Sequence, residues 1–262
     1  MVFRPTQGAA AMPDDLARNL DRAGAIVRVA KRVAVLTGAG ISAESGLATF
    51  RGSGGLWEGH RVEDVATPRA FARDPALVWR FYNMRRANLA NAAPNPGHHA
   101  LAALEKHLPG AFTLVTQNVD GLHQAAGSKN VLEIHGAIRR VRCVGCGVVE
   151  DRGVEALPDL PRCAACNQLL RPDVVWFEEM LPEAIWRQAE WAAQECDCFL
   201  VIGTSAVVYP AAGLVESARI NGTQIIEINL TPTPASQRAD VVLLGPSGTV
   251  VPALLQRVAS VG

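Results

Sequence analysis

The stretch Val33-Ala34-Val35-Leu36-Thr37-Gly38-Ala39-Gly40-Ile41-Ser42 decides the fold of this chain. Its first half is a short, β-branched apolar run, typical of a buried strand, and the run breaks into Gly-x-Gly. Glycines at this position let the backbone approach a pyrophosphate, and the free N–H groups of a following helix favour its charge. The stretch therefore predicts a nucleotide-binding loop, although the acidic residue that usually follows about 20 positions later is missing.

The rest of the chain alternates apolar runs with amphipathic segments, which predicts a parallel sheet with helices on both faces. No strand is expected between residues 47 and 110. Each main strand stops at glycine or small polar residues, and ligands bind at such strand ends in open α/β sheets. The other expected elements are strands at 112–115, 131–134, 198–202, 224–228 and 241–244, and helices at 14–30, 75–92, 97–108, 182–194 and 210–221 with a closing helix near the end.

Composition excludes several classes of protein. A chain of 262 residues with 49% hydrophobic content can bury the core of one large domain or of two. The formal net charge is zero, which argues against nucleic acid or an anionic membrane as the main partner. No apolar run approaches the ~20 residues of a membrane span, and residues 1–12 lack the apolar core of a signal peptide. Six cysteines without an export signal favour a reducing compartment, so a cytoplasmic location is expected. The expected oligomeric state is a monomer.

Four of the six cysteines form two closely spaced pairs. Cys143-x-x-Cys146 and Cys163-x-x-Cys166 are separated by 16 residues. Four thiolates at this spacing close a tetrahedral zinc site that has no open position, so the expected metal is structural. Cys196 and Cys198 lie among apolar residues and are expected to be core thiols.

Among the six histidines, His135 has the most suggestive position. It follows Ile134 and precedes Gly136 at the end of a short predicted strand. An imidazole there could act as a base near neutral pH. On local grounds a hydrogen-bonded structural role is equally compatible with the sequence.

Several motifs occur in a characteristic order along the chain. They are Gly38-Ala39-Gly40-Ile41-Ser42, Phe50-Arg51-Gly52, Thr116-Gln117-Asn118-Val119-Asp120-Gly121-Leu122-His123, His135-Gly136, the four cysteines, Gly203-Thr204-Ser205 and Asn229. Together these motifs resemble those of the sirtuin family, from about Val33 to the end of the chain. The resemblance accounts for the missing acidic residue, because sirtuins use a modified dinucleotide fold. It implies a Rossmann-like domain (1–46, 111–138, 172–262) and a smaller domain built from a helical insertion (47–110) and a zinc-ribbon insertion (139–171).

The resemblance also implies roles for individual residues. His135 is then the catalytic base, and segment 174–177 resembles the family's substrate clamp, with Glu178 where the family commonly has glycine. The implied substrate-binding residues are Tyr82, Arg85, Val174, Trp176 and Phe177. The implied NAD-binding residues are Gly38, Ala39, Gly40, Ser42, Glu44, Phe50, Arg51, Trp57, Gln117, Asn118, Asp120, Gly203, Thr204, Ser205, Asn229, Leu230, Thr231 and Ser247.

The reaction implied by the resemblance is NAD-dependent removal of acyl groups from protein lysine side chains, which gives nicotinamide and an acyl-ADP-ribose. Tyr82 and Arg85 lie one turn apart on a predicted helix and resemble the pair that marks the desuccinylase and demalonylase branch. Plain deacetylation or mono-ADP-ribosyl transfer is the alternative within the family. Outside it, an NAD-dependent oxidoreductase and a non-catalytic zinc-ribbon module remain alternatives.

Overall fold

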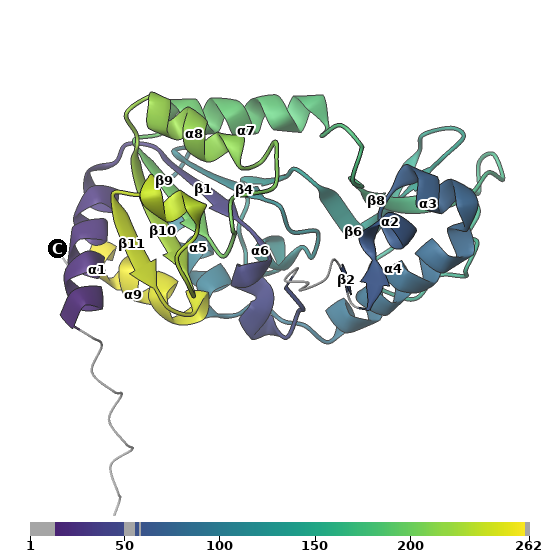
Figure 1. The fold of residues 1–262 in the computed structure, drawn as a ribbon, viewed down its shortest axis with the longest axis horizontal. Helices are drawn as coiled ribbons and strands as arrows, with labels where there is room; N and C mark the ends of the chain where they lie inside the picture. The colour runs from purple at the N-terminus through teal and green to yellow at the C-terminus, as the bar shows by residue number, and fades with distance from the viewer. Residues whose placement is uncertain (1–13, 50–55, 58, 260–262) are drawn as a thin grey trace, which may run out of the picture.

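The computed structural model describes residues 14–49, 56, 57 and 59–259, with only the backbone at 56 and 57. A large and a small part lie side by side in Figure 1. The large part contains six parallel strands, namely β1 (Val33–Thr37), β4 (Phe112–Thr116), β5 (Val131–Glu133), β9 (Cys198–Ile202), β10 (Gln224–Asn229) and β11 (Val241–Leu244). Their order in the sheet is β11-β10-β9-β1-β4-β5.

Helices cover both faces of this sheet, as predicted, because alternate residues of each strand point to opposite sides. Val33 and Val35 of β1 pack on one face with α1 (Asp14–Val29), α5 (Pro96–His107) and α9 (Ser247–Ala259). Ala34 and Leu36 pack on the other face with α7 (Glu183–Glu195) and α8 (Gly213–Ile220). A strand that is buried on both faces needs no polar alternation, which explains the apolar run of β1.

The strand order reverses at the middle of the sheet. From β1 the chain steps outward through β4 to β5, and then returns to β9 on the opposite side of β1 before it continues to β10 and β11. The loops that follow β1 and β9 therefore lie at a topological switch point, where open α/β sheets bind ligands.

The small part has its own core and is assembled from two separate segments. Its elements are α2 (Val62–Val65), α3 (Pro68–Arg73), α4 (Pro75–Ala90) and an antiparallel sheet β7-β6-β8 (Val149–Asp151, Gly136–Cys143, Leu170–Val174). Trp79 and Tyr82 of α4 are buried together with Val141 and Leu170 of the sheet. The zinc-ribbon segment and the helical segment thus share one core.

Two expectations differ from the structure. A short antiparallel hairpin, β2 (Leu56–Trp57) and β3 (His60–Arg61), lies in the region where no strand was expected. Helix α5 lies within the predicted helical insertion, yet its Leu101 and Leu104 join the core beneath the large sheet and the helix packs on α9. We therefore propose a domain boundary near residue 92 instead of 110.

The remaining elements connect the strands and helices named above. The connections contain the 3₁₀ helices η1 (Ala39–Ser45) and η2 (Pro234–Gln237) and the single-turn helix α6 (Leu122–Ala125). Within the described ranges no helix has the length and apolar character that crossing a bilayer requires.

Candidate functional site

The loops after β1 and β9 are in direct contact at the switch point. Gly40 N donates to Gly203 O over 2.8 Å. A Cβ on Gly203, whose φ is +61°, would lie 2.3 Å from the backbone nitrogen of Ile41, and one on Gly38 would lie 2.7 Å from Thr204 Cβ. Glycine is therefore required here by loop-to-loop packing. The helix predicted to follow the loop is the short 3₁₀ helix η1, not an α-helix.

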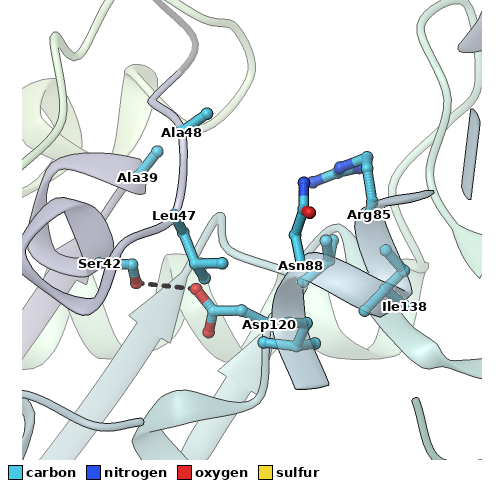
Figure 2. Close-up of a pocket in the computed structure, with 10 residues that line it drawn as sticks. Ala39, Ser42, Leu47, Ala48, Arg85, Asn88, Asp120 and Ile138 are labelled. Carbon is cyan, nitrogen blue, oxygen red and sulfur yellow. Dashed lines mark hydrogen bonds between the residues drawn. The ribbon is translucent and has the colours of Figure 1, made fainter. Parts of the chain in front are cut away.

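Polar side chains predicted to bind NAD gather beneath this loop. Ser42 Oγ donates to Asp120 Oδ2 over 2.8 Å (Figure 2), and Asn118 Nδ2 donates to Ser42 Oγ and to Gly38 O, both over 3.2 Å. Burial raises the pKa of Asp120, whereas hydrogen bonds from Leu122 N and Ser42 oppose the shift. A cavity of about 70 Å³ opens beside the Ser42–Asp120 pair, with Arg85 on its opposite wall (Figure 2).

Two buried histidines support this cluster and were not assigned to the site from the sequence. His123 Nε2 lies 3.0 Å from Thr37 Oγ1, and His98 Nε2 lies 3.4 Å from Ser42 Oγ. Burial lowers the pKa of His98 to about 4 and that of His123 to about 3, so both rings are neutral at physiological pH. The Asn95-Pro96-Gly97-His98 start of α5, where His98 completes a capping box, is the signal that could have located the first of them.

His135 lies on a second, larger cavity of about 290 Å³, which also borders Gln117 and Asn118. Its Nδ1 is 3.0 Å from Gln117 O. A carbonyl oxygen only accepts, so Nδ1 carries the proton and Nε2 keeps its lone pair. Burial lowers the pKa of His135, against the opposing effect of the Gln117 hydrogen bond. The geometry therefore presents a neutral imidazole that can take up a proton at Nε2.

The backbone around His135 is fixed from both sides. His135 O accepts the backbone N–H of Val175 over 2.9 Å. The next residue, Gly136, has φ +77°, and a Cβ there would lie 2.2 Å from Asp173 O. Gly136 thus allows β6 to begin directly against β8, which holds the histidine in place.

The predicted substrate residues line the same cavity as His135. Tyr82 is 1% exposed, and its Oη accepts a hydrogen bond from Trp176 Nε1 over 2.9 Å. The Arg85 guanidinium carbon lies 5.6 Å from the Tyr82 ring centroid, and Arg85 borders both cavities. Val174 is buried, whereas Phe177 is 44% exposed at the rim.

The residues predicted for the adenosine half lie at the ends of β9 and β10. Gln117 Nε2 donates to Thr204 Oγ1, and Asn229 Nδ2 donates to Thr204 O, both over 2.9 Å. Asn229 Nδ2 also donates to the fully buried Glu227, which the sequence analysis did not select. Eight other predicted NAD-binding residues do not border either of the two cavities, namely Gly203, Thr204, Ser205, Asn229, Leu230, Thr231, Ser247 and Glu44. The Glu44 carboxylate accepts a hydrogen bond from Gly248 N, at the start of α9, over 2.6 Å.

Three of the predicted NAD-binding residues cannot be placed. Phe50, Arg51 and the side chain of Trp57 lie outside the described residues.

The four paired cysteines converge in the small part. Their sulfur atoms lie within 4.8 Å of one another, with Cys143 and Cys166 at 3.3 Å and Cys146 and Cys163 at 3.7 Å. Zn–S bonds of about 2.3 Å in a regular tetrahedron place the sulfurs about 3.8 Å apart. The four thiols are thus arranged to bind one zinc ion, while Cys196 and Cys198 are buried elsewhere, as expected for core thiols.

Glu178, the departure from the family pattern, has a backbone that favours glycine. Its φ is +74°, in the left-handed region. Its carboxylate pairs with Arg69, but both side chains are substantially exposed, and such pairs contribute little.

We expect Glu178→Gly to unfold at a higher temperature than Glu178→Ala, by about 2–4 °C. Both variants lose the ion pair with Arg69, but only glycine removes the Cβ. A residue with a Cβ pays about 1 kcal/mol to adopt the left-handed backbone conformation. Thermal unfolding of the two variants in parallel measures the difference. Equal melting temperatures would show that the turn is unstrained.

Comparison with known proteins agrees with this geometry. The sequence pattern of the Sir2 family matches residues 38–210. NAD-dependent protein deacylase 2 of Pyrobaculum aerophilum is 54% identical over 226 residues, which cover 86% of this chain and 90% of that protein. The mitochondrial NAD-dependent protein deacylase sirtuin-5 of Danio rerio is 43% identical over 254 residues, which cover 87% of this chain and 83% of that protein.

A solved structure, that of a Sir2 homolog–NAD complex, superposes with a TM-score of 0.84 at 42% identity, and the match covers 97% of this chain and 96% of that one. Matches of this extent, together with the switch-point loops and the cysteine cluster, confirm the resemblance read from the sequence. The chain therefore belongs to the Sir2 family.

Proposed function

We propose that this chain is an NAD-dependent protein-lysine deacylase, which releases nicotinamide and an O-acyl-ADP-ribose. The observation that supports the proposal best is the neutral His135 imidazole, oriented by Gln117 O on the wall of a 290 Å³ cavity. NAD⁺, when bound, would supply the ribose carbon that the acyl oxygen attacks as nicotinamide leaves, so that the acyl group ends on the ribose. The relatives named as NAD-dependent protein deacylases support the same reaction.

Different residues of the site have different roles in this reaction. The glycine loop after β1 lies at the switch point of the sheet, where the phosphates would approach its backbone. Gln117, Asn118 and Asp120 form the wall on which the nicotinamide and ribose would lie. His135 Nε2 then takes a proton from a ribose hydroxyl. Because Nδ1 of the partly buried His135 already donates to Gln117 O, only Nε2 can take up a proton, and the direction of proton transfer is fixed.

We further propose that the enzyme prefers acyl groups that end in a carboxylate, such as succinyl and malonyl. Tyr82 and Arg85 border one cavity, so a phenol and a guanidinium can bind the same carboxylate. Arginine presents a planar fork that matches a carboxylate, and the bonds are charge-assisted. Plain deacetylation remains the alternative, because the cavity is also lined by apolar side chains such as Val174 and Phe177.

A mass-spectrometric panel tests both parts of the proposal. Acetyl-, malonyl-, succinyl- and glutaryl-lysine peptides are incubated with the protein, with and without NAD⁺. Release of free lysine and nicotinamide only with NAD⁺ is expected. Formation of reduced nicotinamide, seen by its absorbance, would instead indicate an oxidoreductase, and no release from any peptide would favour a binding module. Acylated proteins as partners, the monomeric state and a cytoplasmic location stay predictions.

Arg85→Met is expected to lower kcat/KM for the succinyl peptide by about 10–100-fold. Charge-assisted hydrogen bonds contribute about 1.5–3 kcal/mol each, and about 1.4 kcal/mol corresponds to a factor of ten. The loss should appear mainly in KM, because the carboxylate contact exists in the ground state and in the transition state. Kinetics with succinyl and acetyl peptides measure it, and the acetyl value should change far less.

Arg80→Met is the matched control for this prediction. Arg80 lies on the same helix, but its side chain is 54% exposed and pairs with the equally exposed Asp159. It should leave both substrates unchanged. A parallel fall of succinyl and acetyl turnover in Arg85→Met would mean that Arg85 is structural and that the acidic-acyl assignment is wrong.

A further inference from the structure

Trp176 and Tyr82 share a buried hydrogen bond on the wall of the larger cavity. Trp176 Nε1 donates to Tyr82 Oη over 2.9 Å, and the two residues are 3% and 1% exposed. Both line the cavity of about 290 Å³. An indole N–H can only donate, so this bond uses a lone pair of the phenol oxygen. The phenol proton must then be donated in another direction.

We propose that Trp176 is a specificity-determining residue, because its indole N–H directs the Tyr82 hydroxyl proton toward the carboxylate of an acidic acyl group. The inference rests on the proposed preference for succinyl- and malonyl-lysine. A donor whose direction is already fixed loses less freedom when the carboxylate binds. Burial of Tyr82 raises the pKa of its phenol, against the lowering effect of Arg85, so the hydroxyl keeps the proton that it has to donate.

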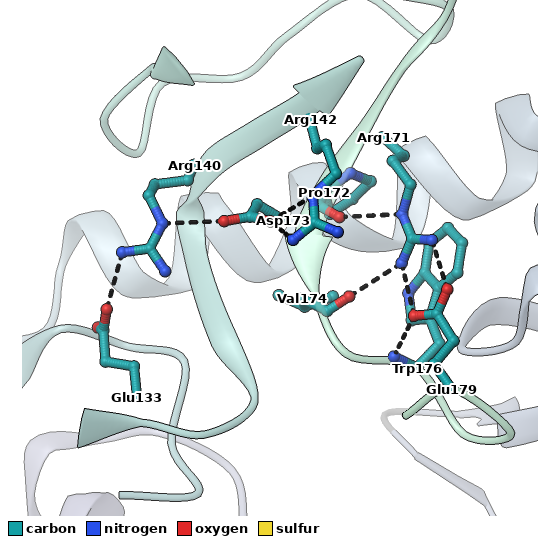
Figure 3. A network of polar contacts seen from close by, with 9 residues as sticks. All are labelled: Glu133, Arg140, Arg142, Arg171, Pro172, Asp173, Val174, Trp176 and Glu179. Atoms are coloured by element: carbon teal, nitrogen blue, oxygen red, sulfur yellow. Dashed lines mark hydrogen bonds and ion pairs between the residues drawn. The ribbon is translucent and has the colours of Figure 1, made fainter. Parts of the chain in front are cut away.

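Trp176 is itself held from three directions, as Figure 3 shows in part. The Arg171 guanidinium carbon lies 3.5 Å from the centroid of the indole ring. Arg171 also forms an ion pair with Glu179 at 2.6 Å, and Glu179 Oε2 accepts the backbone N–H of Trp176 over 2.9 Å. The centroid of the Phe71 ring lies 5.3 Å from that of the indole ring, and both residues belong to the core of the small part. These contacts fix the indole, and the indole in turn fixes the phenol.

The effect of Trp176 on substrate preference distinguishes this role from that of a general packing residue. A tryptophan that only filled the core would act equally on every substrate. A tryptophan that sets the direction of the Tyr82 proton acts only on substrates that accept that proton. The ratio of kcat/KM for succinyl to acetyl peptide therefore separates the two roles, because effects common to both substrates cancel in it.

Trp176→Phe tests the proposal, because phenylalanine keeps an aromatic ring and removes the N–H. We expect the succinyl-to-acetyl ratio to fall about five- to tenfold, as for the loss of one well-directed hydrogen bond. The change should lie in KM for the succinyl peptide. The same substitution in a Tyr82→Phe background should change the ratio by less than about twofold, since no hydroxyl remains to be directed.

Trp79→Phe is the matched control. Trp79 lies in the same buried core, and its Nε1 donates to Leu170 O over 2.8 Å, whereas the Tyr82 hydroxyl accepts from Trp176. It should lower the melting temperature as Trp176→Phe does, but leave the ratio unchanged. Glu179→Gln, which removes the charge that pairs with Arg171 and retains an acceptor for Trp176 N, gives a second variant in case Trp176→Phe does not fold. It should lower the ratio in the same direction.

The outcomes separate this inference from the function on which it rests. If the wild-type protein shows no preference for succinyl over acetyl peptide, the acidic-acyl proposal fails and the inference fails with it. If the wild-type protein prefers succinyl peptide and neither Trp176→Phe nor Glu179→Gln changes the ratio, only the inference is overturned. Equal effects of Trp176→Phe in the presence and absence of the Tyr82 hydroxyl would also overturn it.

Discussion

His135→Ala is expected to lower kcat by about 10²–10⁴-fold, the usual cost of removing a general base. The expectation follows from the hydrogen bond between Nδ1 and Gln117 O, which leaves Nε2 as the basic nitrogen. Affinity for NAD⁺ should be largely retained, because a base acts on the transition state more than on binding. Steady-state kinetics with an acyl peptide and calorimetric titration with NAD⁺ measure the two quantities separately.

The pH profile of kcat/KM gives an independent readout of the same base. Burial lowers the pKa of His135, so the imidazole stays neutral as the pH falls through the ordinary histidine value of about 6.5. Activity should therefore decline only at more acidic pH. His107→Ala, at an exposed histidine of α5, is the control and should leave the rate unchanged. Near-normal turnover of His135→Ala would assign the proton transfer to another residue.

The features that could be predicted from the sequence are those whose signal is local. The four-residue apolar run at 33–36, the paired cysteines and the glycine that follows His135 can each be recognised from a few neighbouring positions. The ends of the predicted elements are less accurate. The predicted strand 131–134 ends one residue earlier in the structure, and the predicted helix 210–221 begins only at Gly213. Such shifts do not change the face or the order of any element.

The features that were missed depend on contacts between distant segments. His98 and His123 reach the site through partners 56 and 86 positions away in the chain, and for these two residues the only local signal named above is the capping box of His98. Helix α5 follows the small-part helices in sequence, but its leucines complete the core beneath the sheet. The sequence around Glu227 does not indicate that this side chain is fully buried. In the structure it is, and it accepts a hydrogen bond from Asn229. These properties exist only in the folded chain.

The zinc site should affect the catalytic cavity from a distance, through Arg86. Arg86 is fully buried next to Arg85 on α4, and its guanidinium donates to the backbone oxygens of Ile138 (2.6 Å), Glu155 (2.9 Å) and Arg152 (3.1 Å). A buried cation whose partners move away is strongly destabilising. The ribbon that carries the cysteines is thus bound to the helix that carries Tyr82 and Arg85.

Cys143→Ser is therefore expected to remove the zinc, unfold the ribbon and abolish deacylation of every acyl peptide. Structural zinc supplies about 10–16 kcal/mol of apparent binding free energy in small metal domains. That is comparable to the ~5–15 kcal/mol total stability of a typical domain, so the small part cannot keep its fold without the metal. Elemental analysis, amide hydrogen exchange over residues 139–171 and turnover are measured on the same preparation. Cys196→Ser, at a buried thiol outside the cluster, should keep one zinc per chain, whereas a folded and active Cys143→Ser protein without zinc would contradict a structural role for the metal.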